Sequence, residues 1–213
     1  MSTTSTKMPW PGLKRSLVAI LRGIRPEEVE AILGALIEEG FEAIEIPLNS
    51  PQPWVSIGKA VELFGERALI GAGTVLTVED VHKLADLGGR IMVSPNTDAQ
   101  VIGAAVERGL YSMPGCYTAS EALLAIKSGA SALKFFPAAT LGPSGIAAIC
   151  TILPRNAVVG AVGGVSERDF ADYVKAGVRA FGLGSSLYRP GDNAANVREK
   201  AKRTIAAYDA LGL

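Results

Sequence analysis

The feature that most constrains the fold of this chain is a repeat of short apolar runs alternating with segments of helical spacing. The segments 77–89 and 97–109 each begin with Thr, carry acidic residues in their first turn and end in Gly, which are typical helix start and stop signals. Strands alternating with helices form parallel sheets with right-handed crossovers. Runs rich in Val, Ile, Leu and Ala begin eight times, 20 to 26 residues apart, near Leu17, Ala43, Ala68, Ile91, Tyr111, Ala132, Val158 and Arg179.

Eight β/α units in 213 residues predict an α/β fold, a single-domain (β/α)₈ TIM barrel. The alternative is an open doubly wound sheet, which usually has fewer units. The run "GAGTVL" at residues 71–76 lacks the third glycine of a dinucleotide-binding loop. No linker or shift in composition divides the chain. We therefore expect one barrel domain over residues 13–213, preceded by a flexible lead-in over residues 1–12.

Charge and composition argue against several classes of partner. Lys and Arg together number 21, as do Asp and Glu, so a net charge of zero favours neither a nucleic acid nor an anionic membrane. The apolar stretches are far shorter than the roughly 20 residues of a membrane span. The start of the chain lacks the apolar core of a signal peptide, and the two cysteines do not make a disulfide framework. These features predict a cytoplasmic protein.

One lysine interrupts an apolar strand. Successive side chains of a strand point to opposite faces, so Leu133 and Phe135 suit the helix side and Lys134 points into the barrel. By the same rule Glu45 points inward, between Ile44 and Ile46. The alternative is a buried ion pair that only holds the barrel together. Buried ion pairs stabilise proteins poorly, because desolvation offsets their attraction, so we favour a functional interpretation.

Two further polar residues stand at the ends of strands. Alternation along the first strand sends Arg22 inward, and Thr74 ends the third strand on the face of Ile70 and Ala72. We expect these side chains to converge with the lysine and the glutamate at the carboxyl ends of the strands, where barrel enzymes keep their chemistry.

A lysine in this setting is a candidate nucleophile. Burial and a neighbouring Arg22 lower the pKa of Lys134, whereas Glu45 raises it. A neutral amine attacks a ketone to form a Schiff base, and the protonated imine allows a nearby C–C bond to break. Glu45 is the candidate group that gives and takes protons. No spacing of His, Asp, Glu or Cys suggests a metal site, so we expect neither a metal nor another cofactor.

Turns that contain glycine follow the last two strands. Gly163 and Gly164 end the seventh strand, and Ser185 follows the eighth. Loops at these places often bind phosphate, because glycines let backbone N–H groups approach the oxygens. Arg22, on the adjacent first strand, is a candidate charged partner. Taken singly, such glycines also have a plain geometric explanation as turns. A non-covalent phosphosugar isomerase or epimerase, or a non-catalytic phosphate-binding barrel, therefore remains an alternative.

The ordered motifs "AILRGI", "GFEAIEIPLNSP", "IGAGTVL", "VSPN", "PGCYTASEA", "ALKFFPA", "AVGGV" and "GLGSSLY" resemble the family of 2-keto-3-deoxy-6-phosphogluconate and 6-phosphogalactonate aldolases. The resemblance spans residues 17–188. It implies a (β/α)₈ barrel, usually a homotrimer, that cleaves a phosphorylated keto sugar acid into pyruvate and D-glyceraldehyde 3-phosphate. It also implies a Schiff-base lysine at Lys134, a proton shuttle at Glu45, a pyruvate site at Arg22, Thr74 and Pro95, and phosphate contacts at Gly163, Gly164 and Ser185.

The resemblance extends to a choice between two branches. The gluconate branch usually carries Arg-Thr-Pro after the glutamate strand and a threonine before the paired glycines. This chain has Asn49 and Val162 at the corresponding places and so looks like the galactonate branch, of the De Ley–Doudoroff galactose route. The two substrates differ only at the C4 hydroxyl, so one polar contact can decide between them. The same reaction on the gluconate epimer is the alternative.

Overall fold

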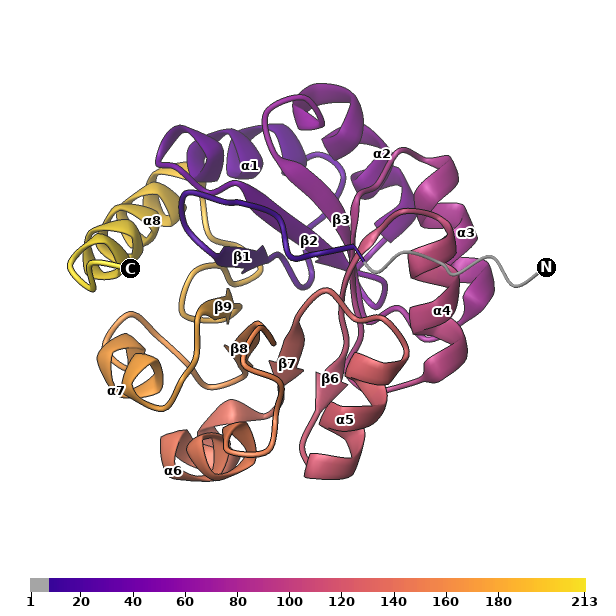
Figure 1. Cartoon of the computed structure of the whole chain (residues 1–213). Helices are drawn as coiled ribbons and strands as arrows, with labels where there is room; N and C mark the ends of the chain where they lie inside the picture. Colours follow the sequence, from indigo (N-terminus) through magenta and orange to yellow (C-terminus); the bar gives the residue numbers. More distant parts are fainter. Residues whose placement is uncertain (1–7) are drawn as a thin grey trace.

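The computed structural model describes residues 8–213, which form a ring of parallel strands surrounded by helices (Figure 1). The strands are β1 (Leu17–Ile20), β2 (Ala43–Pro47), β3 (Leu69–Gly73), β4 (Ile91–Val93), β5 (Tyr111–Met113), β6 (Gly115–Cys116), β7 (Leu133–Phe135), β8 (Val159–Val162) and β9 (Ala180–Leu183). The helices are α1 (Val29–Glu38), α2 (Pro53–Phe64), α3 (Val78–Asp86), α4 (Ala99–Glu107), α5 (Ala119–Lys127), α6 (Ala138–Cys150), α7 (Phe170–Lys175) and α8 (Ala194–Asp209). The predicted α/β barrel is therefore confirmed.

The predicted fifth strand is in fact two short strands separated by Pro114. The sheet runs β5-β4-β3-β2-β1-β9-β8-β7-β6, so β5 pairs with β4 whereas β6 pairs with β7. Proline has no N–H to donate and interrupts the ladder at this point. Its carbonyl still accepts a hydrogen bond from the Lys134 backbone N–H, at 2.9 Å. The ring thus closes across Pro114, next to the strand that carries Lys134.

Local signals in the sequence set the helix ends. The Thr77 side chain caps α3 by accepting a hydrogen bond from the Asp80 N–H, and Asp98 caps α4 in the same manner. Gly88 and Gly109 follow the ends of these helices with φ of +82° and +68°, a backbone region that glycine enters without strain. The two helices therefore begin and end where the sequence predicts.

The alternation along the strands divides the core into two layers. The larger hydrophobic cluster lies between sheet and helices and includes Leu17, Ile44 and Phe135. A second cluster fills the interior of the ring and includes Val18 and Ala43. These neighbours in sequence lie in different clusters because a strand alternates its faces.

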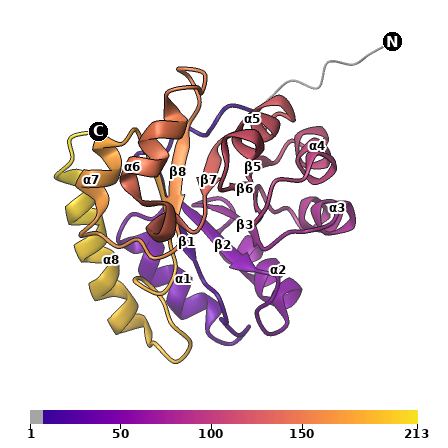
Figure 2. The same ribbon diagram turned by 90° about the horizontal axis from the view of Figure 1, so that it is seen from below.

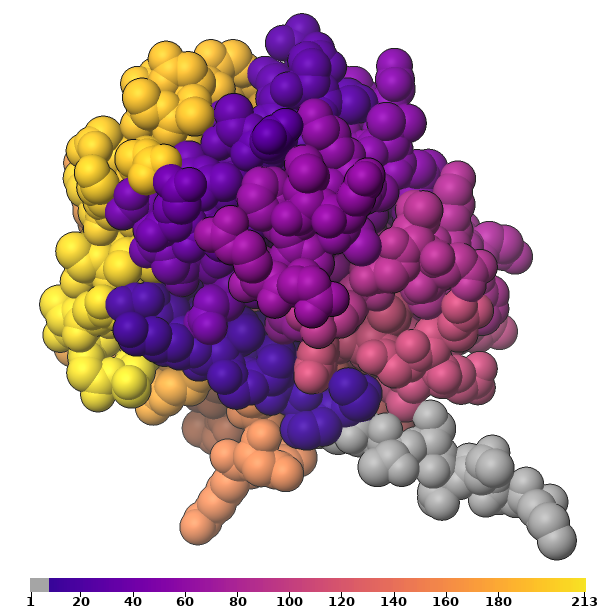
Figure 3. Space-filling view, turned by 90° about the horizontal axis from the view of Figure 1, so that it is seen from above, coloured from indigo at the N-terminus to yellow at the C-terminus, as the bar shows by residue number. Residues whose placement is uncertain are grey.

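The first and the last helix of the chain lie side by side. Helix α8 packs against α1, as Figures 1 and 2 show, and in the space-filling view the yellow atoms of α8 lie against the indigo N-terminal part (Figure 3). Trp10 donates its indole N–H to Ser16 at 3.3 Å. Residues 1–7 of the predicted lead-in lie outside the described part. Between residues 8 and 213, no helix has both the length and the apolar character needed to cross a membrane.

Candidate active site

A cavity at the carboxyl ends of the strands contains most of the predicted site residues. Lys134 of β7 and Glu45 of β2 line it, and Arg22 reaches it from the end of β1. Lys134 and Glu45 are 5% and 2% exposed, so the cavity holds two ionisable groups removed from bulk water. Such groups with perturbed pKa values, gathered in a cleft, are characteristic of active sites.

Lys134 lies at the wall of this cavity with its amine over an aromatic ring. Its Nζ is 4.8 Å from the centre of the Phe136 ring. Burial lowers the pKa of Lys134 below its usual value, the Glu45 carboxylate raises it, and the Arg22 cation lowers it further. Because burial is the largest of these effects, a larger share of neutral amine is present near pH 7 than for an exposed lysine.

The Glu45 carboxyl group rests against a glycine. A Cβ added at Gly73 would lie 2.0 Å from Glu45 Oε2. This oxygen is buried and has no hydrogen-bond partner among residues 8–213. Burial raises the pKa of Glu45 to about 7, although Lys134 and Arg22 lower it. A carboxyl group that titrates near neutrality can both accept and donate a proton at that pH.

Sequence reasoning did not identify Gly73 as part of the site. The signal was present in the run "GAGTVL", whose glycines were considered only for a nucleotide-binding loop. A glycine paired in register with Pro47 and facing the lumen leaves the space that the glutamate carboxyl group occupies.

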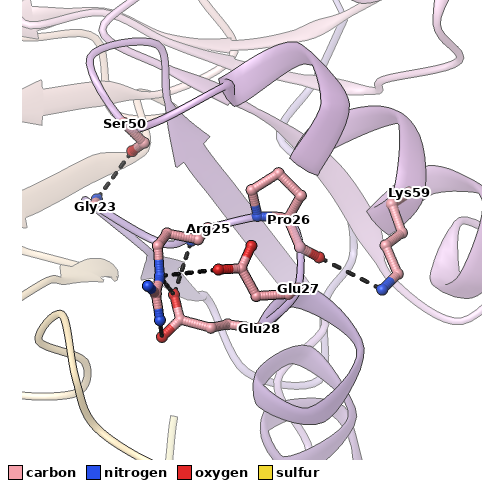
Figure 4. A network of polar contacts seen from close by, with 7 residues as sticks. All are labelled: Gly23, Arg25, Pro26, Glu27, Glu28, Ser50 and Lys59. Carbon is pink, nitrogen blue, oxygen red and sulfur yellow. Dashed lines mark hydrogen bonds and ion pairs between the residues drawn. The ribbon is translucent and has the colours of Figure 1, made fainter.

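Arg22 is held on the β2 side of the cavity. Its guanidinium donates a hydrogen bond to the Asn49 side-chain oxygen, which gives that predicted specificity residue a direct contact with the site. The next residue, Gly23, donates its N–H to Ser50 Oγ at 2.9 Å (Figure 4). Ser50 is 7% exposed, so this contact between the two loops is partly shielded from water. Ser50 supports the loop that carries Arg22, a role that the sequence analysis did not identify.

The same loop carries a network of polar contacts next to the site (Figure 4). Arg25 donates its backbone N–H to Glu28 at 2.9 Å and pairs through its side chain with Glu27 and Glu28. Lys59 of α2 donates to the Pro26 carbonyl oxygen at 3.4 Å. These contacts tie the β1–α1 loop to α2 and fix the backbone from which Arg22 projects.

The predicted phosphate loops also line the cavity, through Gly163, Gly164 and Ser185. Gly163 and Gly164 have φ of +91° and +73°, and a Cβ at Gly163 would lie 2.9 Å from the Phe136 ring. Glycine is therefore required here both by the backbone conformation and by the closeness of the ring. Val162 precedes them and lines the same cavity with its apolar side chain.

Thr74 and Pro95 are not among the residues that line this cavity. From the sequence, Thr74 was placed on an inward face together with Ile70 and Ala72. That assignment was wrong, because Ile70 and Ala72 pack in the cluster between sheet and helices. Thr74 itself has φ of +57°, so the alternation of the strand ends before it. The Pro95 carbonyl lies against Gly115 of β6. The roles of both residues at a pyruvate site remain predictions.

Among residues 8–213, no three His, Cys, Asp or Glu side chains are grouped so that they would hold a metal ion. Cys116 lies near the site, but burial raises the pKa of its thiol to about 12, so it is a poor nucleophile at neutral pH. The arrangement instead brings together a buried amine, a carboxyl group that titrates near neutrality and open glycine loops. These are the components of amine-dependent chemistry on a phosphorylated carbonyl compound.

Comparisons with known proteins agree with this geometry. The sequence profile of the family described as KDPG and KHG aldolase matches residues 13–200. A probable 2-dehydro-3-deoxy-6-phosphogalactonate aldolase of Rhizobium meliloti is 58% identical over 96% of this chain and 97% of its own. The 2-dehydro-3-deoxy-6-phosphogalactonate aldolase of Escherichia coli is 47% identical over 94% of this chain and 98% of its own. The solved structure described as native KDPGal superposes with a TM-score of 0.93, at 46% identity, over 96% of this chain and 99% of that one.

Proposed function

The chain belongs to the KDPG and KHG aldolase family and is a carbon–carbon lyase, and we propose that it cleaves 2-dehydro-3-deoxy-6-phosphogalactonate through a Schiff base on Lys134. The observation that carries this proposal is the single cavity that Lys134 shares with Glu45 and with the glycine loop at 163–164. The products are pyruvate and D-glyceraldehyde 3-phosphate.

The first half of the reaction makes the imine. The neutral amine of Lys134 attacks the C2 carbonyl carbon, and the resulting carbinolamine loses water to give a protonated imine. Glu45, whose pKa burial raises to about 7, supplies the proton that the departing hydroxide needs. The low polarity around the amine favours its neutral form before attack, because desolvation penalises the ammonium ion.

In the second half of the reaction the C3–C4 bond breaks and the two products are released. Glu45 accepts the proton of the C4 hydroxyl, the C3–C4 bond breaks, and its electron pair moves into the imine to give an enamine. D-glyceraldehyde 3-phosphate leaves with the new aldehyde at the former C4. Glu45 then protonates C3 of the enamine, and water hydrolyses the imine to release pyruvate and the free amine of Lys134.

The remaining predicted residues divide between the two ends of the substrate. We assign the phosphate group to the backbone N–H groups at Gly163 and Gly164 and to Ser185. We assign the pyruvyl end to Arg22, Thr74 and Pro95. The hydrogen bond from Arg22 to Asn49 supports the placement of Arg22 on the side of β2, near Glu45.

Val162 supports the galactonate epimer. It lines the cavity immediately before the phosphate loop and is 4% exposed, so any substrate hydroxyl that points at it meets an apolar surface. A hydroxyl-bearing side chain at this position would form a hydrogen bond that valine cannot form. The names of the relatives from Rhizobium meliloti and Escherichia coli support the same choice.

Borohydride reduction in the presence of pyruvate tests the covalent step. We expect the chain to gain the mass of a reduced pyruvyl adduct on Lys134, and Lys134→Ala to gain none and to show no turnover. Glu45→Gln is expected to keep the fold and to slow turnover by at least about 10²-fold, the lower range for general acid–base help. An isomerase or a non-catalytic phosphate-binding barrel gains no adduct, so unmodified Lys134 after reduction overturns the proposal.

Two further proposals follow the family resemblance. We propose a homotrimer, and the exposed apolar side chains Leu123 and Leu124 of α5, each 43% exposed, support the presence of contact surfaces. A mass of three 22.2 kDa chains in light scattering is the expected result. A cytoplasmic location remains a prediction from the sequence.

A further inference from the structure

The residues of the predicted phosphate loops that line the cavity carry no charge. Gly163, Gly164 and Ser185 offer backbone N–H groups and a hydroxyl, which are neutral donors. A phosphate group that enters a partly buried cavity carries close to two negative charges and is bound most strongly by charged donors. Arg22 lines the same cavity, but its guanidinium already gives one hydrogen bond to Asn49, in the segment after β2.

A second cavity continues from the first one at this point. The two cavities share Ile20, Arg22, Gly184 and Ser185 in their walls, and the second is also lined by Arg189. Arg189 donates its Nε–H to the Ser185 carbonyl oxygen at 3.0 Å. This bond engages one donor of the guanidinium group and fixes it beside the phosphate loop, while the terminal nitrogens retain further donors.

The segment that carries Arg189 is braced against the loop of Arg22. A Cβ added at Gly23 would lie 2.7 Å from Pro190 Cγ, so the proline packs directly on the glycine. Gly23 has φ of +84° and is itself bonded to Ser50 (Figure 4). Arg189 also donates its backbone N–H to Asp192 Oδ2 at 2.9 Å. The backbone that carries the Arg189 side chain is therefore held by contacts on two sides.

The charge of Arg189 is available to a ligand. Among residues 8–213, the ion pair of Asp192 is with Lys200, and no carboxylate lies within 4.0 Å of the Arg189 guanidinium. The side chain is exposed at the rim, so an anion that enters the cavity can reach it. The sequence analysis assigned no chemistry to this segment.

We propose that Arg189 binds the phosphate group of the substrate as the charged partner of the Gly163–Gly164 loop. This inference rests on the proposed function and adds a substrate-binding residue to it. Arginine suits the task because its planar group gives parallel hydrogen bonds to two phosphate oxygens.

Kinetics on a matched pair of substrates test the proposal. We compare the parent, Arg189→Met, Arg189→Lys and the control Arg155→Met, which removes an exposed arginine from the loop before β8, at the other end of the barrel. Arg189→Met is expected to raise KM for the phosphorylated substrate by about 10- to 100-fold, the usual range for a hydrogen bond to a charged group. For the dephosphorylated analogue, kcat/KM is expected to stay within about twofold, because the lost contact binds only phosphate. Arg189→Lys recovers part of the loss, and Arg155→Met behaves like the parent.

Binding of DL-glycerol 3-phosphate gives a readout without a Schiff base, since this probe has no carbonyl group. Its affinity is expected to fall in Arg189→Met and to stay unchanged in Arg155→Met. Equal losses on both substrates, or an unchanged affinity for the probe, overturn the proposal. If the parent forms no pyruvate adduct but the probe still depends on Arg189, the proposed function fails while the phosphate contact stands.

Discussion

Replacing Gly73 with alanine is expected to displace the Glu45 carboxyl group and slow the reaction while the barrel stays folded. The added Cβ would lie 2.0 Å from Glu45 Oε2, whereas ordinary contact begins at 3.4 Å, so this oxygen must move by about 1.4 Å. The oxygen ends a flexible side chain, and Gly73 does not have positive φ. The side chain therefore moves, and the backbone does not.

The size of the effect follows from this displacement. A misplacement of about 1 Å can cost a reaction about 10²-fold in rate, which corresponds to about 2.7 kcal/mol of activation free energy. We therefore expect kcat of Gly73→Ala to fall by about 10²-fold. The Lys134 amine is untouched, so the reduced pyruvate adduct still forms on prolonged incubation.

Pyruvate release, coupled to lactate dehydrogenase, measures the turnover, and thermal unfolding measures the fold. The matched control is Gly58→Ala in α2, where the nearest heavy atom to the added Cβ is 4.0 Å away. This control keeps full activity and gains about 0.5–1 kcal/mol of stability, the usual effect of alanine in place of glycine within a helix. Aspartate is one methylene shorter than glutamate. The double variant with Glu45→Asp and Gly73→Ala is therefore expected to lose less kcat than the product of the losses in the two single variants. Parent-like turnover in Gly73→Ala would refute the assignment of Glu45 as the proton shuttle or its position against this glycine.

Two further predictions concern pH and substrate choice. Because burial raises the pKa of Glu45 from 4.5 to about 7, the folded protein holds a proton that the unfolded chain has lost, and this group's contribution to stability falls as the pH rises through that range. Denaturant unfolding should therefore show Glu45→Gln gaining stability relative to the parent between about pH 4.5 and 7, and a constant difference would contradict the raised pKa. Val162→Thr is expected to shift the ratio of kcat/KM values from the galactonate toward the gluconate epimer, by about 10-fold for one new hydrogen bond. An unchanged ratio would remove the physical basis of the epimer assignment.

The sequence by itself determined the barrel and the ends of helices α3 and α4. Eight apolar runs at regular spacing admit few topologies other than a ring of parallel strands, and the caps at Thr77 and Asp98 act within a few residues of themselves. Strand parity also indicated that Lys134 and Glu45 point inward, because in each case large apolar neighbours flank a single charged residue. The structure places both side chains in one cavity.

Only the tertiary structure decided the contacts between strands and loops distant in sequence. The face of β3 was misjudged because its inward positions, Gly71 and Gly73, carry no side chains, so the alternation left no signal to read. The interruption at Pro114 depends on which neighbour each half-strand pairs with. The position of Arg189 beside Ser185 depends on the packing of Pro190 on Gly23, a contact between the first and last strand ends. Such contacts arise from the closure of the ring, and no local pattern in the sequence encodes them.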